Sequence, residues 1–132
     1  KNPIYAAMIE KLDDSVGRIC QVIKTLGIAD RTIVIFYSDN GGSEPVTDNY
    51  PLNGGKGMPY EGGSRVPLII RWTGKIEGGI RSSVPITGVD FYPTFVTLAQ
   101  GKIPANLDGK ETASSVNRSV RYSPNIPSSN PT

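Results

Sequence analysis

The chain has 132 residues, a length that suits one ordinary domain or a part of a larger one. Its net charge is only +2 and no basic block occurs, so we expect no nucleic-acid partner, which would require clustered positive charge. No apolar run approaches the ~20 residues of a membrane span, so we expect no membrane-spanning helix either.

The first predicted element is a helix over residues 4–26. Apolar side chains recur at intervals of three or four residues from Ile4 to Leu26, which places them on one face. Gly27 follows the last of them and is a typical helix end. Cys20 lies among apolar neighbours in this segment, where a structural thiol is more common than a nucleophile.

A strand is predicted next, because residues 33–36 form an uninterrupted apolar run. Such a run is typical of a strand that is buried on both faces in a parallel sheet. Asp39 and Asn40 follow it directly, and ligands of open α/β sheets bind beyond the carboxyl ends of strands. Their side-chain oxygens suit Ca²⁺ or Mg²⁺, but Asp-Asn-Gly-Gly is also good turn chemistry. The residues alone leave both interpretations open, with a turn as the more common outcome.

Residues 41–63 are predicted to form a long loop rich in glycine. Loops of this length in compact domains are usually functional or disordered. Within it, glycines surround Lys56, so the backbone can approach a ligand while an ammonium group reaches it. The spacing is not that of a nucleotide P-loop. We expect Glu61 and Arg65 to pair with each other or with the scaffold.

The last predicted elements are a strand over residues 66–72 and a helix that starts at Asp90 and ends near Gly101. Asp90 is expected to cap this helix or to stabilise its dipole, and Phe95, Leu98 and Ala99 are expected to face inward. The segment after residue 110 has no hydrophobic period, which predicts a folded part over 1–109 and a poorly ordered tail over 110–132.

Four motifs occur together in an order that is typical of one enzyme family. They are Ser38-Asp39-Asn40-Gly41-Gly42, Asn53-Gly54-Gly55-Lys56-Gly57, Tyr60-Glu61-Gly62-Gly63-Ser64-Arg65-Val66-Pro67 and Asp90-Phe91-Tyr92-Pro93-Thr94. In this combination the chain closely resembles the type I sulfatases from about Tyr5 to Gly109. These are the formylglycine-dependent, arylsulfatase-like members of the alkaline phosphatase superfamily.

The resemblance implies roles for three residues. Asp39 and Asn40 match two ligands of the family's divalent cation, usually Ca²⁺, and Lys56 matches the lysine that contacts the sulfate ester. The implied substrate is an aryl or carbohydrate sulfate ester. A fixed cation and an ammonium group would stabilise the charge that is redistributed over the sulfate and leaving-group oxygens in the transition state.

The same resemblance implies that other parts of the site lie outside this chain. The family's formylglycine forms in a Cys/Ser-x-Pro-x-Arg motif, which this sequence lacks, so we expect it in a missing N-terminal part. The family's active-site histidines are also absent, since the chain has none. We therefore expect the C-terminal portion of a sulfatase catalytic domain, a fragment of a sulfuric-ester hydrolase that is inactive alone.

Two alternatives to this function stay open. One is a non-catalytic module that binds anionic saccharides or serves as a scaffold, and the other is a phosphoester hydrolase of the same superfamily. The family suggests an exported, periplasmic or lysosomal location, whereas the residues themselves indicate no compartment.

The expected fold belongs to the α/β class. We expect part of an alkaline-phosphatase-like layered fold, with helices packed on a mixed sheet. A fragment of this size would leave a sheet edge or face uncovered, and the exposed apolar surface would favour self-association.

Overall fold

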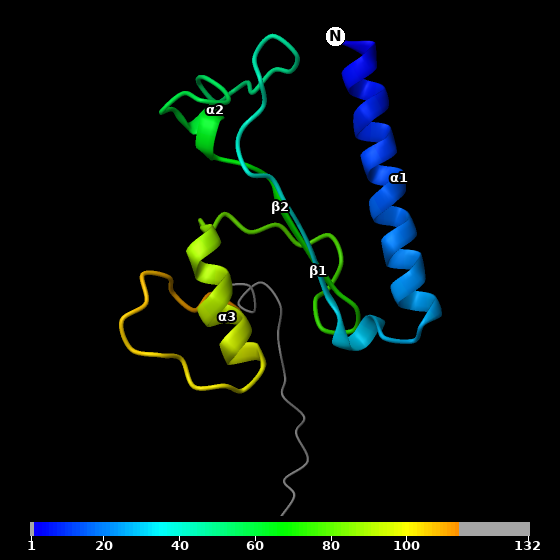
Figure 1. Ribbon diagram of the computed structural model, residues 1–132, viewed down its shortest axis with the longest axis vertical. Helices are drawn as coiled ribbons and strands as arrows, with labels where there is room; N and C mark the ends of the chain where they lie inside the picture. Colours follow the sequence, from blue (N-terminus) through cyan, green and yellow to red (C-terminus); the bar gives the residue numbers. More distant parts are fainter. Residues whose placement is uncertain (1, 114–132) are drawn as a thin grey trace, which may run out of the picture. The chain divides into compact units, whose positions relative to one another are not determined.

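The computed structural model describes residues 2–113 of the chain (Figure 1). The chain consists of two compact units. The first unit covers residues 1–74 and the second begins at Lys75. Figure 1 shows a long helix, two paired strands and a loop region with a short helix in the first unit. In the second unit, the described residues form one α-helix with its flanking segments.

The long helix α1 (Pro3–Thr25) confirms the first sequence prediction. Its start is capped by Asn2, whose side-chain oxygen accepts hydrogen bonds from the N–H groups of Ile4 and Tyr5, at 3.0 Å and 3.2 Å. Gly27 has a φ of +66°, the left-handed conformation that ends helices and that glycine adopts without strain. Much of the apolar face is exposed, with Ile4 at 73% and Met8 at 64%.

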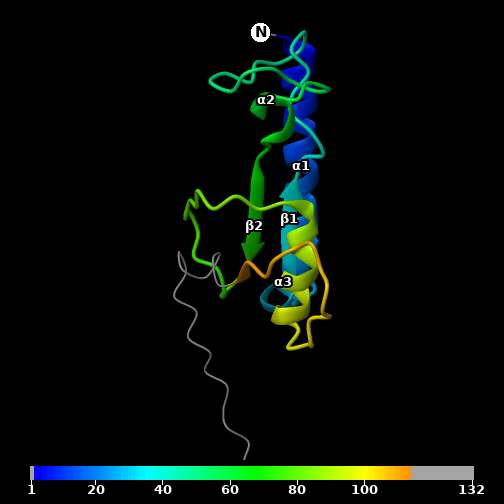
Figure 2. The same cartoon turned by 90° about the vertical axis from the view of Figure 1, so that its left-hand side faces the viewer.

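The two strands form an antiparallel pair (Figure 2). Strand β1 (Ile33–Tyr37) pairs with β2 (Leu68–Trp72), so that Ile35 lies opposite Ile70. A 3₁₀ turn η1 (Ala29–Arg31) precedes β1, and the indole of Trp72 donates a 2.7 Å hydrogen bond to the carbonyl of Asp30. These helices and this small sheet confirm the predicted α/β class.

The expectation that β1 is a fully buried, parallel strand was wrong for this sheet. Its residues 33–36 are only half-buried and Tyr37 is exposed. An apolar run indicates that both faces of a strand are suited to burial, but burial itself needs covering layers. In the described part of the chain, the second strand and the helices do not supply enough of them.

The second unit is organised around Asp90. This residue ends the 3₁₀ turn η2 (Gly88–Asp90) and precedes helix α3 (Phe91–Leu98). Its carboxylate accepts the N–H of Thr87 at 2.8 Å in a capping box of η2, but it makes no side-chain cap to α3. The predicted side-chain cap of α3 was therefore wrong: Thr87 is the N-cap of η2, and Asp90 is the third residue of that turn and completes its capping box.

The buried face of α3 differs from the predicted one. Pro93 and Thr94 are buried, whereas Phe95 is 42% exposed and Leu98 37% exposed. The chain returns to this buried face after residue 109, where the N–H of Thr112 donates to the Thr94 hydroxyl at 3.0 Å. Residues 114–132, which make up most of the predicted tail, lie outside the described residues.

Candidate functional site

The glycine-rich loop between the strands folds back onto the end of β1. Figure 1 shows this loop and the short helix α2 (Glu61–Ser64) at the end of the sheet where β1 finishes and β2 begins. The N–H of Gly41 donates to the carbonyl of Gly63 at 2.9 Å, and the N–H of Gly62 donates to the main-chain carbonyl of Asn53 at 2.8 Å. Main-chain hydrogen bonds therefore hold parts of this loop together.

Glycine is required at the centre of this loop because backbone meets backbone there. Gly41, Gly55 and Gly62 are all buried. A Cβ atom added at Gly41 would overlap the carbonyl oxygen of Gly62, and one added at Gly62 would overlap the carbonyl oxygen of Gly54. The glycines around Lys56 were predicted to let the backbone approach a ligand. In the structure, one of them, Gly55, approaches the loop's own backbone at the carbonyl of Gly42, and the approach of a ligand stays a prediction.

This folding brings the three candidate residues to one end of the sheet. The N–H of Lys56 donates to the carbonyl of Gly42 at 3.0 Å. This hydrogen bond holds the backbone of Lys56 next to Gly42, which is two residues after Asn40 in the sequence. The side chains of Asp39 and Lys56 are exposed, and that of Asn40 is half-buried. An acid, an amide and an ammonium group are therefore available to a ligand at this end.

The donor atoms of Asp39 and Asn40 suit a hard cation. The Asn40 amide nitrogen donates to the carbonyl of Gly41 at 3.0 Å, which leaves its Oδ1 as the amide atom able to bind a cation. The Asp39 carboxylate adds two more oxygens at the strand end. Ca²⁺ takes six to eight oxygens, however, and no group of three His, Cys, Asp or Glu side chains suited to a metal occurs in residues 2–113. These residues fit half of a calcium site.

Asn49 is a functional candidate that the sequence prediction missed. Its Oδ1 accepts the N–H of Gly42 at 3.1 Å, while its amide nitrogen donates to the carbonyls of Gly42 and Gly54 at 2.9 Å and 3.1 Å. The available signal was an asparagine inside a turn-rich segment, since its short amide readily bonds to nearby backbone.

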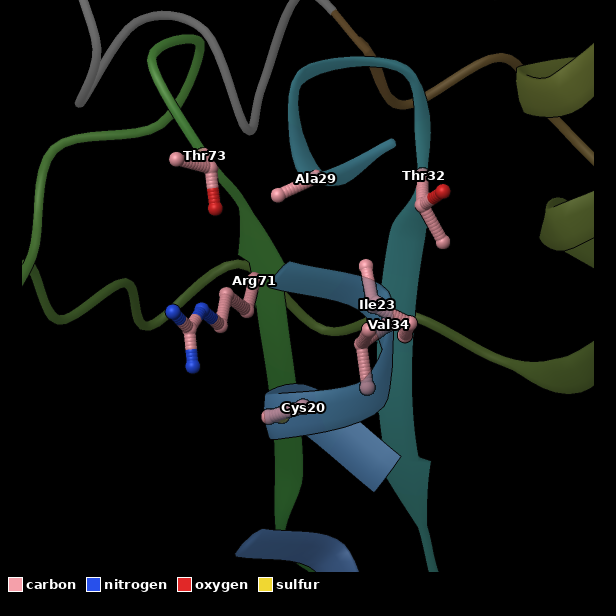
Figure 3. Close-up of a pocket in the computed structure, with 7 residues that line it drawn as sticks. All are labelled: Cys20, Ile23, Ala29, Thr32, Val34, Arg71 and Thr73. Atoms are coloured by element: carbon pink, nitrogen blue, oxygen red, sulfur yellow. The ribbon is translucent and has the colours of Figure 1, made fainter. Parts of the chain in front are cut away.

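Other predicted features are structural. Arg65 and Glu61 form an ion pair of 3.6 Å in which both side chains are 68% exposed, as expected. Cys20 is half-buried and lines a small pocket next to Ile23, Val34 and Arg71 (Figure 3). The pocket's lining contains no carboxylate that could act as a base for the thiol.

Within residues 2–113, no helix combines the length and the apolar character needed to cross a bilayer.

Comparison with known proteins decides the family. The sequence model of the family described as Sulfatase matches residues 3–102. The chain belongs to the sulfatase family. It is 43% identical over 123 residues to a sulfatase of Formosa agariphila, covering 83% of this chain and 22% of that protein. It is 33% identical over 119 residues to the human steryl-sulfatase, covering 82% of this chain and 20% of that one.

A solved structure shares the fold. The crystal structure of Ps i-CgsB in complex with k-i-k-neocarrahexaose matches with a TM-score of 0.80 and 37% identity, over 87% of this chain and 26% of that chain. This likeness confirms the predicted sulfatase, alkaline-phosphatase-like fold for most of the chain. The chain spans only about a fifth to a quarter of the length of these proteins.

Proposed function

We propose that this sulfatase chain forms part of the catalytic domain of a sulfuric-ester hydrolase. In this proposal Asp39 and Asn40 supply oxygen ligands to a divalent cation, and Lys56 binds the sulfate group of the substrate. A bound Ca²⁺ would supply electrostatic stabilisation of negative charge on the sulfate oxygens. The nucleophile and the remaining ligands would come from other parts of a complete sulfatase, so the chain alone is inactive.

The observation that carries the proposal is the hydrogen bond from Lys56 to Gly42. It holds a lysine from the middle of a long loop close to the acid and amide that follow β1. A sulfate ester needs both kinds of group, because a cation and an ammonium can share its anionic oxygens. The exposure of the Asp39 and Lys56 side chains leaves them available for this role.

The proposed substrate class is a carbohydrate or aryl sulfate. Support for a sulfated carbohydrate comes from the similar Ps i-CgsB structure, which holds an oligosaccharide, k-i-k-neocarrahexaose. Support for a smaller sulfate ester comes from the steryl-sulfatases and arylsulfatases among the relatives.

The proposal is tested by titrating the ¹⁵N-labelled chain with inorganic sulfate, with and without Ca²⁺, and following its amide resonances. We expect sulfate to shift the resonances of Lys56 and Gly57, and Lys56→Ala to weaken binding roughly fivefold or more, as loss of a charge-assisted contact does. Lys24→Ala is the matched control, because it removes an equal charge from an exposed position on α1. An aryl sulfate should not be hydrolysed by the chain alone.

Three results would contradict parts of this proposal. Equal weakening by Lys24→Ala and Lys56→Ala would show that sulfate responds only to overall charge. Binding of a sulfated saccharide that needs neither Ca²⁺ nor Lys56 would favour the non-catalytic saccharide-binding module. Metal-dependent hydrolysis by the purified chain would refute its inactivity, and a preference for phosphate esters would favour the phosphoester hydrolase.

A further inference from the structure

We infer that Asn49 is the positioning residue that sets the place of Lys56 relative to Asp39 and Asn40. This inference rests on the proposed sulfate-binding role of Lys56. It concerns a residue that has no charge and that acts through the backbone of the loop.

The bonding pattern of Asn49 uses its whole amide group. The oxygen accepts from the N–H of Gly42, and the nitrogen donates its two hydrogens to the carbonyls of Gly42 and Gly54. The Asn49 side chain therefore joins Gly42, which follows the Asp39–Gly41 segment, to Gly54, which lies two residues before Lys56. The opposite amide orientation would set an NH₂ group against the N–H of Gly42, so only one orientation satisfies all three bonds.

Gly42 is the point at which the two halves of the candidate site meet. Its carbonyl accepts both the Asn49 amide at 2.9 Å and the Lys56 N–H at 3.0 Å. Gly55, which lies between Gly54 and Lys56, is buried against this carbonyl. Movement of Gly42 therefore displaces Lys56 and the strand end together, and Asn49 is the side chain that restrains it.

Neither aspartate nor alanine at position 49 reproduces this pattern. Aspartate has the same shape and keeps the acceptor for the Gly42 N–H, but its carboxylate would face the carbonyls of Gly42 and Gly54 without a hydrogen to donate. Alanine loses all three bonds. The two substitutions therefore separate the acceptor function of Asn49 from its donor function.

The first test is hydrogen exchange of single backbone amides, measured by NMR. We expect Asn49→Ala to accelerate exchange at Gly42 and Lys56 roughly tenfold or more, while amides in the middle of β1 and β2 keep their rates. Asn49→Asp should accelerate exchange at Lys56 but leave Gly42 better protected. Asn53→Ala is the matched control, since Asn53 contributes its backbone carbonyl to Gly62 and its side chain is exposed. Unchanged exchange at Lys56 in both Asn49 variants would overturn the inference.

The second test is a double-mutant cycle on sulfate affinity, which distinguishes positioning from general support of the fold. If Asn49 acts through Lys56, Asn49→Ala weakens sulfate binding in the wild-type chain but adds no further loss to Lys56→Ala. Additive losses would overturn the inference and show a merely structural role. A wild-type chain whose Lys56 resonance does not respond to sulfate would instead refute the proposed function, whatever the exchange rates at Gly42.

Discussion

Replacing Gly41 by alanine tests whether the segment after β1 contacts α2 through backbone atoms alone. The added Cβ would overlap the Gly62 carbonyl oxygen and lie 3.0 Å from the Cα of Gly63, and neither atom can rotate away. Overpacking of this kind costs about 1–3 kcal/mol. The shift also weakens the hydrogen bond from the Gly41 N–H to the Gly63 carbonyl, worth about 1 kcal/mol. We expect a loss of roughly 2–4 kcal/mol in the free energy of unfolding.

Gly17→Ala is the matched control, because a Cβ added there has nothing within 4 Å and the residue lies inside α1. This change should stabilise the chain by about 0.5–1 kcal/mol through helix propensity. Both variants are compared by urea unfolding, followed by the fluorescence of Trp72, the sole tryptophan, which lies in the same unit. A Gly41→Ala chain that is as stable as the wild type would refute the close backbone contact.

Three further predictions concern other parts of the chain. The pKa of Asp90 is held below its usual 3.8 by the N–H groups of Lys110 and Thr87. The ionised carboxylate therefore stabilises the folded second unit fully above pH 3.8, and this stabilisation is lost as the pH falls through the lowered pKa. Asp90→Asn should remove this acid dependence from melting curves of the second unit. Asn2→Ala should destabilise α1 by about 1 kcal/mol, seen as reduced helicity by circular dichroism, and an unchanged spectrum would argue against the cap. Ile69 is 60% exposed on β2, so Ile69→Lys should reduce concentration-dependent association in sedimentation velocity, whereas a wild type that is already monomeric would contradict the predicted self-association.

The sequence predicted those elements whose signals are local. The apolar spacing that ends at Leu26, followed by Gly27, located α1 because helix periodicity and a left-handed stop are properties of neighbouring residues. The two strands were located for the same reason. Their antiparallel pairing was not, since an apolar run in residues 33–36 describes which faces can be buried and says nothing about the partner strand.

The candidate site was predictable in its chemistry but not in its construction. Asp39, Asn40 and Lys56 were identified by residue type and by the family resemblance, and their roles stay predictions. The hydrogen bonds of Asn49 to Gly42 and Gly54, and that of Lys56 to Gly42, depend on how a long loop folds back on itself. No periodic pattern in the sequence predicts such contacts with the main chain of glycines, because glycine has no side chain whose polarity could indicate its environment.

The hydrogen bond between Thr112 and the buried Thr94 affects how short this chain can be made. Thr94 donates to the Asp90 carbonyl at 2.6 Å, and its oxygen accepts the N–H of Thr112, while the N–H of Lys110 is bound by the Asp90 carboxylate at 2.8 Å. Cutting the chain at Gly109 would remove both returning N–H groups and expose the start of α3 to water. A shortened protein intended for crystals or for NMR should therefore end after Thr112.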